Sequence, residues 1–298
     1  MASAGKSSRR EFLATTATVA VSGAAVSEVS GQGNTRENAA PRKFELGTVT
    51  YNLARNWDLD TLINNCEETG FKAVELRSTH KHGVEIDISE AQRKAVKDRF
   101  NDTPVKLVCL GTTCEFHSPD QAVVRERIDE AKEFVKLASD VGSTAIKVRP
   151  NGVPENVPKE KTFEQIGTSL REVGRFAEQH GVEIWMEVHG RESSHPPYIA
   201  EMMKFCGHPS VGLTWNCNDS DLKDGDPTPY FNLLKDHIRN VHMRDLTVGY
   251  PFRKVFALLR GIGYAGYTLS EIPEVKGDPI RFMKYYRMLW DELSSSPG

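Results

Sequence analysis

The sequence predicts an α/β protein built as a single (β/α)8 barrel that begins near Phe44. Short apolar segments alternate with longer segments of helical periodicity, and this pair recurs eight times along the chain. The competing fold, a doubly wound sheet, usually opens with a glycine-rich loop after its first strand. The corresponding segment here, 51–56, reads Tyr-Asn-Leu-Ala-Arg-Asn and contains no glycine. The repeat pattern and the missing loop together favour the closed barrel.

Helix start and stop signals bound the expected elements. Gly70, Gly142 and Gly181 follow three of the helical segments, and glycine readily adopts the left-handed conformation that ends a helix. Ser89 is the expected N-cap of the second helix. Strands are expected at 45–51, 73–76, 105–110, 145–148, 182–186, 211–215, 239–243 and 267–270. Helices are expected at 58–69, 89–100, 122–141, 163–180, 197–206, 229–237, 252–259 and 280–293.

Residues 1–43 are predicted to be a twin-arginine-type signal peptide followed by a disordered lead-in, with the barrel occupying 44–298. Arg9 and Arg10 precede a Phe-Leu pair and a small, uncharged apolar run, Ala14 to Val26. This order is typical of bacterial twin-arginine export signals, although a chance arginine pair is the alternative. The run is shorter than the roughly 20 residues that span a bilayer, so no stable membrane span is expected in the mature chain. We therefore expect export to the bacterial periplasm.

Composition limits the class of partner. The chain has 298 residues, a formal charge of −3 and 39% hydrophobic residues, which suits one globular domain with a sizeable core. The slightly acidic balance argues against nucleic acid as a partner. Five cysteines without metal-binding spacing are expected to be free and mostly buried, a Cys109–Cys114 disulfide being the alternative. The oligomeric state stays open, a homo-oligomer included.

Four consecutive late strands each end near a side chain that carries a metal-binding oxygen or nitrogen. Glu187 closes the fifth expected strand, and Asn216 follows the sixth. His242 lies in the seventh, and Glu271 directly follows the eighth. Strand ends meet at one face of a (β/α)8 barrel, so we expect these groups to converge. A glutamate at the end of a buried strand also needs its charge compensated, and a bound cation does this.

This donor set has a preferred metal and suggests a chemistry. Oxygen ligands with one nitrogen and no sulfur favour Mn²⁺, with Mg²⁺, Co²⁺, Fe²⁺ or Zn²⁺ as alternatives. The two glutamates come from opposite sides of the expected site, so each would face one side of a chelated sugar. One would remove a proton from carbon and the other return it, with the enediolate stabilised between them.

Four segments resemble the xylose isomerase-like TIM-barrel superfamily, and within it the sugar isomerase/epimerase branch. The segments are Met186–His189, Leu213–Asn216, Val241–Asp245 and Leu269–Glu271. The resemblance covers roughly Phe44 to Leu293 and implies a divalent-metal-dependent isomerase or epimerase acting on a small-molecule sugar or glycoside. It implies the metal ligands Glu187, Asn216, His242 and Glu271, the acid/base pair Glu187 and Glu271, and the substrate neighbours His189, Asp219 and Arg244.

One ligand position departs from the family, which usually has aspartate where this chain has Asn216. An amide oxygen still binds a hard cation, but the site loses one negative charge. The choice of Asn216 over Asn218 or Asp219 therefore stays open. The early strand ends add three candidate substrate contacts, namely His80, Glu115 and Arg149. For Arg149, an ion pair with Glu187 or Glu115 is an equal alternative, and the His189 side chain equally fits between strand and helix.

Three other functions remain open at this stage. A lyase or hydratase acting on 3-keto-glycosides would need the same carbon-acid step at the same metal site, and export favours it. A non-catalytic exported sugar-binding barrel is suggested by Asn216. An endonuclease-like enzyme acting at abasic DNA would need more histidines and a basic groove, which the net charge opposes.

Overall fold

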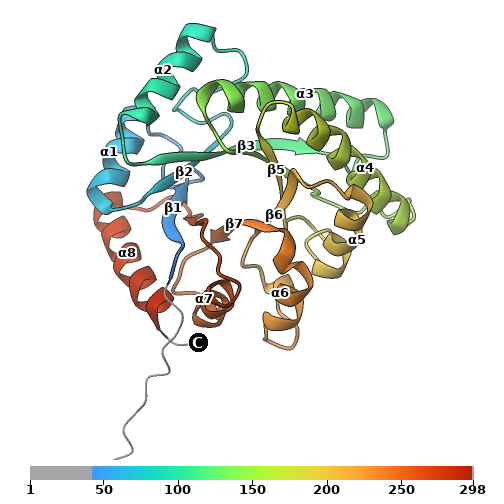
Figure 1. The fold of residues 1–298 in the computed structure, drawn as a ribbon. Helices are drawn as coiled ribbons and strands as arrows, with labels where there is room; N and C mark the ends of the chain where they lie inside the picture. Colours follow the sequence, from blue (N-terminus) through green and yellow to red (C-terminus); the bar gives the residue numbers. More distant parts are fainter. Residues whose placement is uncertain (1–41, 297–298) are drawn as a thin grey trace, which may run out of the picture. The chain divides into compact units, whose positions relative to one another are not determined.

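A closed barrel of parallel strands forms the centre of the computed structural model, which describes residues 42–296 (Figure 1). This confirms the predicted (β/α)8 fold. The predicted export signal lies outside the described residues, as does the predicted lead-in except for Arg42 and Lys43. In the described part of the chain, no helix is both long and apolar enough to cross a bilayer.

Eight strand–helix pairs follow one another along the chain. The strands are β1 (Glu45–Val49), β2 (Ala73–Arg77), β3 (Lys106–Glu115), β4 (Ala145–Arg149), β5 (Glu183–Glu187), β6 (Val211–Trp215), β7 (Ile238–Met243) and β8 (Tyr267–Ser270). The helices are α1 (Leu59–Thr69), α2 (Glu90–Asn101), α3 (Gln121–Val141), α4 (Lys159–Glu178), α5 (Pro196–Cys206), α6 (Thr228–Leu234), α7 (Phe252–Gly261) and α8 (Pro279–Ser295). Two short 3-10 helices, η1 (Asp219–Asp221) and η2 (Lys235–His237), interrupt the connections that flank α6.

Strand pairing closes the barrel in chain order. Each strand pairs with its neighbours in the sequence, and β1 also pairs in parallel with β8. The helices lie outside the strands, so the apolar face of each helix packs against the barrel wall (Figure 1). All carboxyl ends of the strands therefore meet at one mouth.

Capping explains the helix bounds that the sequence predicts. Gly70 and Gly142 end α1 and α3 with φ angles of 78° and 79°, in the left-handed region that favours glycine. Ser89 caps α2, because its side chain accepts from the Gln92 backbone while the Gln92 side chain accepts from the Ser89 backbone. These local signals fix most element bounds to within a few residues of the prediction.

Strand β3 is longer than predicted and carries one of the site residues. It continues from 110 to Glu115, with a register shift against β4 between Gly111 and Glu115. The Thr112 hydroxyl donates to the Lys147 carbonyl at 2.8 Å and so bridges the two strands where the backbone ladder is interrupted. Beyond the shift, Glu115 is opposite Arg149.

Alternation along the strands decides which side chains face the barrel interior. Ala73, Ala145 and Trp185 pack together with Leu269 in a small apolar cluster inside the barrel. Side chains two residues further along a strand share that face. The interior therefore changes from apolar to charged toward the mouth. All five cysteines are buried and free, so the disulfide alternative is wrong.

Candidate active site at the carboxyl ends of the strands

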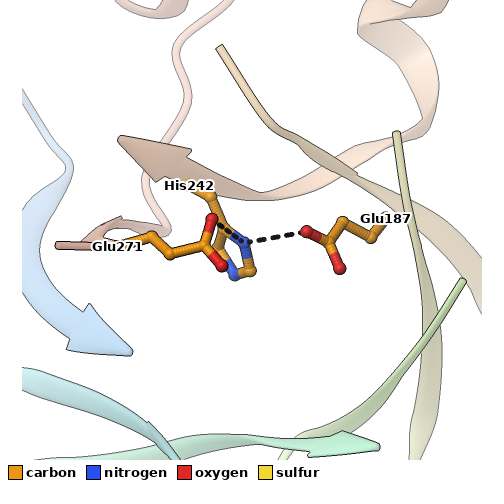
Figure 2. Close-up of side chains that lie close together, drawn as sticks. All are labelled: Glu187, His242 and Glu271. Carbon is orange, nitrogen blue, oxygen red and sulfur yellow. Dashed lines mark ion pairs between the residues drawn. The ribbon is translucent and has the colours of Figure 1, made fainter. Parts of the chain in front are cut away.

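Three of the four predicted metal ligands converge at the mouth of the barrel. Glu187, His242 and Glu271 each offer one ligand atom, and these atoms lie within 4.8 Å of one another (Figure 2). His242 Nδ1 is 3.7 Å from Glu187 Oε1 and 3.7 Å from Glu271 Oε2. Glu187 and His242 are buried, whereas the Glu271 side chain is 27% exposed. The cluster therefore joins the core to the mouth.

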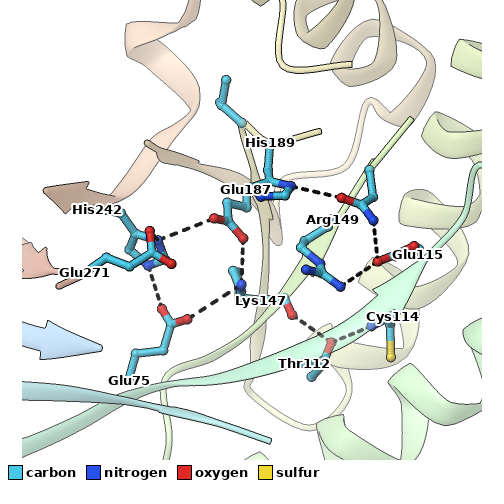
Figure 3. Close-up of polar contacts among 12 residues, drawn as sticks. Glu75, Thr112, Cys114, Glu115, Lys147, Arg149, Glu187, His189, His242 and Glu271 are labelled. Atoms are coloured by element: carbon cyan, nitrogen blue, oxygen red, sulfur yellow. Dashed lines mark hydrogen bonds and ion pairs between the residues drawn. The ribbon is translucent and has the colours of Figure 1, made fainter. Parts of the chain in front are cut away.

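Two members of this cluster, His242 and Glu187, also belong to a ring of alternating acids and bases. Glu75 and Lys147 complete the ring (Figure 3). Glu75 Oε2 is 2.9 Å from His242 Nε2. Lys147 Nζ is 2.6 Å from Glu187 Oε2 and 4.0 Å from Glu75 Oε1. All four residues are buried. The ring therefore links β2, β4, β5 and β7 through side chains alone.

The sequence interpretation counted Glu75 and Lys147 among the strand-end residues at the mouth but gave them no role in the site. Both are charged residues inside short apolar strands, and both lie two residues before an arginine that ends the strand. Alternation then places them on the inward face one step below the mouth. A buried charge within a strand needs a partner, and this was the available signal.

Glu75 determines how His242 is oriented. His242 Nε2 faces Glu75, while Nδ1 is buried without a hydrogen-bond partner and faces the two glutamates. Donation from Nε2–H to Glu75 leaves the Nδ1 lone pair free for a ligand. Burial alone would lower the pKa of His242, but the carboxylates around it raise the pKa to about 10. A potential that holds a proton this strongly also attracts a cation.

The two glutamates at the cluster occupy different electrostatic environments. Burial opposes the charge on Glu187, but Lys147 and His242 outweigh it and hold its pKa well below the usual range. Burial raises the pKa of Glu271, an effect that the Glu187 charge reinforces and the His242 charge opposes. Burial also disfavours the Lys147 ammonium, yet the surrounding carboxylates raise its pKa and keep it charged.

The donor atoms fit a divalent cation. Asn216 Oδ1, like His242 Nδ1, is a buried atom without a hydrogen-bond partner. A buried polar atom left unpaired costs about 1–3 kcal/mol, so His242 Nδ1, which lies 3.7 Å from each of two carboxylates, indicates a ligand there. Asn218 instead donates its side-chain N–H to the Val188 carbonyl, and Asp219 is exposed. The assignment of Asn216 as a ligand stays a prediction, but it is the buried candidate of the three.

A second polar chain covers one side of the mouth. Arg149 Nη2 donates to Glu115 Oε1 at 2.5 Å, and the Asn151 side chain donates to the same oxygen at 2.7 Å. His189 Nδ1 lies 3.0 Å from Asn151 Oδ1. Of the alternatives for Arg149, the structure therefore contains the ion pair with Glu115, whereas the buried charge of Glu187 is paired with Lys147.

Part of this site borders a cavity of about 90 Å³. Its walls are formed by Tyr51, Arg77, Lys147, Arg149, Glu187, His189 and Glu271. Because His189 is among them, its side chain borders the mouth. Tyr51 and Arg77 are additional wall residues that the sequence interpretation did not include among the site residues.

Three predicted substrate contacts have other neighbours. His80 is buried and its Nδ1 lies 2.9 Å from the Thr50 hydroxyl, while burial and nearby Arg77 lower its pKa to about 4. Arg244 donates to Asp219 at 2.7 Å, and this pair is largely exposed. The structure brings neither these three residues nor Glu115 into the cavity wall, so the contact of all four with substrate stays a prediction.

The barrel and its polar mouth define the class of protein, a (β/α)8 barrel with its candidate site at the carboxyl ends of the strands. Within that class, the chain belongs to the xylose isomerase-like TIM barrel family, whose sequence model matches residues 63–286. This confirms the resemblance drawn from the sequence. A comparison with curated proteins gives no match.

Several solved structures share the fold. The IolI protein with a bound zinc atom has a TM-score of 0.70 at 17% identity, covering 85% of this chain and 98% of that one. D-psicose 3-epimerase has a TM-score of 0.72 at 14% identity, covering 85% and 100%. The 3-keto-D-glucoside 4-epimerase YcjR from E. coli has a TM-score of 0.66 at 16% identity, covering 84% and 99%. At these identities the likeness shows the fold.

Proposed function

We propose that the protein is a divalent-metal-dependent sugar isomerase or epimerase that transfers a proton at a carbon next to a carbonyl. The observation that carries this proposal is the convergence of Glu187, His242 and Glu271 at the barrel mouth, with ligand atoms within 4.8 Å of one another. The epimerases among the proteins of the same fold support the same reaction class.

The residues proposed to hold the cation are Glu187, Asn216, His242 and Glu271. The donor set suits Mn²⁺ first, and the zinc atom in the IolI structure supports Zn²⁺ as an alternative. When bound, the cation would supply Lewis-acid stabilisation of negative charge that develops on the substrate oxygens.

The side chains of this protein would carry out the proton transfer. Lys147 holds Oε2 of Glu187, so Oε1 is the oxygen left toward the site. Glu271 reaches the same site from the end of β8, where it borders the cavity. One glutamate would remove the proton and the other return it to the same or the adjacent carbon. The Glu115–Asn151–His189 chain would position hydroxyl groups on the side of β3 to β5.

Replacing Glu271 with Gln tests the proposal. The amide oxygen keeps a ligand atom but accepts no proton, so we expect turnover to fall by about 10²–10⁴-fold with metal content largely intact. Solvent deuterium incorporation into ketoses measures turnover, and elemental analysis measures metal content. Glu274→Gln, an exposed glutamate on the same loop, is the matched control. Unchanged deuterium incorporation in Glu271→Gln would reject the role of Glu271.

A second candidate is a lyase or hydratase that acts on 3-keto-glycosides at the same site. The 3-keto-D-glucoside 4-epimerase of the same fold favours it, because a 3-keto-glucoside carries the acidic carbon that such an elimination requires. The proposed export of the chain to the periplasm, based on Arg9 and Arg10, is consistent with a glycoside substrate met outside the cytoplasm. Product analysis separates the two: a cleaved glycosidic bond supports the lyase, and a new stereoisomer supports the epimerase. Sugar binding without deuterium incorporation, across several metals, would favour a non-catalytic barrel.

A further inference from the structure

Arg77 is a cation on the cavity wall that the proposed chemistry does not use. It is the last residue of β2, and alternation places it on the inward face above Glu75. Its guanidinium lies over the Tyr51 ring, 5.1 Å from the centroid, and both residues border the cavity. Stacking on an aromatic ring holds the planar guanidinium in place while leaving its N–H groups available.

The charge of Arg77 has no partner within the described part of the chain. The other two cations of the wall are each paired with a carboxylate: Lys147 with Glu187 at 2.6 Å, and Arg149 with Glu115 at 2.5 Å. Among residues 42–296, the Arg77 side chain forms neither an ion pair nor a hydrogen bond. Its guanidinium therefore offers free donors to the cavity.

The charges of the site leave Arg77 in excess, a step that rests on the proposed function. The carboxylates of Glu75, Glu187 and Glu271 carry three negative charges. A divalent cation and the Lys147 ammonium together offset these three, and Glu115 offsets Arg149. One positive charge, that of Arg77, remains on the wall of a small cavity, where an uncompensated charge is costly.

We propose that Arg77 binds an anionic group of the substrate, a carboxylate or a phosphate, so that the substrate is an acidic sugar. The guanidinium offers two parallel N–H donors, which match the oxygens of either group. In the closed barrel β2 lies opposite β6, with three strands between them in each direction. The anionic group is thus held on the side of the mouth away from Asn216, where it anchors the sugar without competing for the cation.

The test compares three probes on the full chain loaded with Mn²⁺: D-fructuronate, D-fructose 6-phosphate and D-fructose. Calorimetry measures binding to the wild type, Arg77→Met and Arg77→Lys. We expect one acidic probe to bind at least about tenfold more tightly than D-fructose, as for a charge-assisted pair. Arg77→Met should lose that preference while D-fructose binding changes less than about threefold. Arg77→Lys, which keeps the charge without the fork, should be intermediate. The acidic probe whose affinity falls more in Arg77→Met shows whether the bound group is a carboxylate or a phosphate.

Arg55→Met is the matched control. Arg55 is an exposed arginine on the β1–α1 loop at the same mouth, but it does not border the cavity. Arg55→Met should leave the preference for the acidic probe intact. A similar loss of that preference in Arg55→Met and Arg77→Met would show that it arises from long-range charge, and would overturn the proposal. Equal binding of all three probes to the wild type would also overturn it.

Absence of deuterium incorporation from every probe, with Arg77-dependent binding retained, would reject the proposed reaction and support the anion site. If Arg77→Met fails to fold by circular dichroism, Arg77→Lys alone decides: an undiminished preference contradicts the bidentate contact.

Discussion

At the scale of single residues, two buried contacts determine which atoms reach the candidate site. Glu75 engages Nε2 of His242, and Lys147 engages Oε2 of Glu187, so the second donor atom of each ligand faces inward. Both supporting residues are buried members of the same ring, and Lys147 also borders the cavity. Removal of a side chain that orients a metal ligand in this way usually lowers the metal affinity strongly.

We expect Glu75→Gln to weaken Mn²⁺ binding by about 10–100-fold, the range for loss of a group that orients a metal ligand. The amide can donate as well as accept, so it no longer selects the tautomer of His242 with a proton on Nε2. Calorimetric Mn²⁺ titration measures affinity, and nitrogen NMR of the imidazole reports the tautomer. Glu45→Gln, an exposed glutamate at the opposite end of the barrel, is the control. An unchanged affinity and tautomer would show that Glu75 has no orienting role.

At the scale of elements, the end of β3 shows where sequence reasoning stopped short. The predicted strand ended at 110, directly before the sequence Gly-Thr-Thr. The structure continues the strand to Glu115, supported by the Thr112 hydroxyl bond to β4. Glycine is required here for space, since a Cβ on Gly111 would lie 2.6 Å from Glu75 Oε1. Gly111 and Glu75 lie on different strands, and their separation in the sequence is far longer than the local window on which strand prediction depends.

Gly111→Ala should therefore destabilise the fold by about 1–3 kcal/mol, the usual cost of overpacking. The added methyl group meets a carboxylate that His242 and Lys147 already hold, so it cannot move aside freely. Urea unfolding measures the change. The matched control is Gly261→Ala at the end of α7, where a new Cβ would have no neighbour within 4 Å. Alanine there should be neutral or stabilising by up to about 1 kcal/mol. Equal stabilities of the two variants would contradict the packing argument.

At the scale of the whole molecule, the sequence predicted the barrel and three converging ligands but not the buried ring. Eight periodic repeats and glycine stops are local signals, and they suffice for the architecture. Glu187, His242 and Glu271 were found because they lie at or near the carboxyl ends of late strands. Glu75 was not, because its contact with His242 joins residues 167 positions apart and depends on how the closed barrel brings β2 near β7.

The stability of the whole molecule should depend on the ionisation of Asp221, a buried residue of η1. Burial raises the pKa of Asp221 from 3.8 to about 8, against the opposing effects of the Asn218 backbone N–H and Arg244. Between these values the folded state holds a proton that the unfolded state releases. The Asp221 contribution is therefore fully present below about pH 3.8 and is lost as pH rises toward 8.

Asp221→Asn should remove this dependence. The difference in unfolding free energy between variant and wild type should grow in favour of the variant from pH 5 to pH 8, by at most about 1.4 kcal/mol per pH unit. Urea unfolding at several pH values measures it, and Asp219→Asn, an exposed neighbour in the same short helix, is the control. A difference that stays constant with pH would show that Asp221 is ionised in the folded state throughout.

The ring of Glu75, His242, Glu187 and Lys147 also limits how descendants of this sequence can change. Loss of one member of the ring leaves a buried charge without its partner. Replacement of an acid together with a base leaves the net charge of the ring unchanged. Evolution can thus leave this arrangement only by paired replacement. The four residues would therefore change together, although they lie on four separate strands and form no contiguous sequence motif.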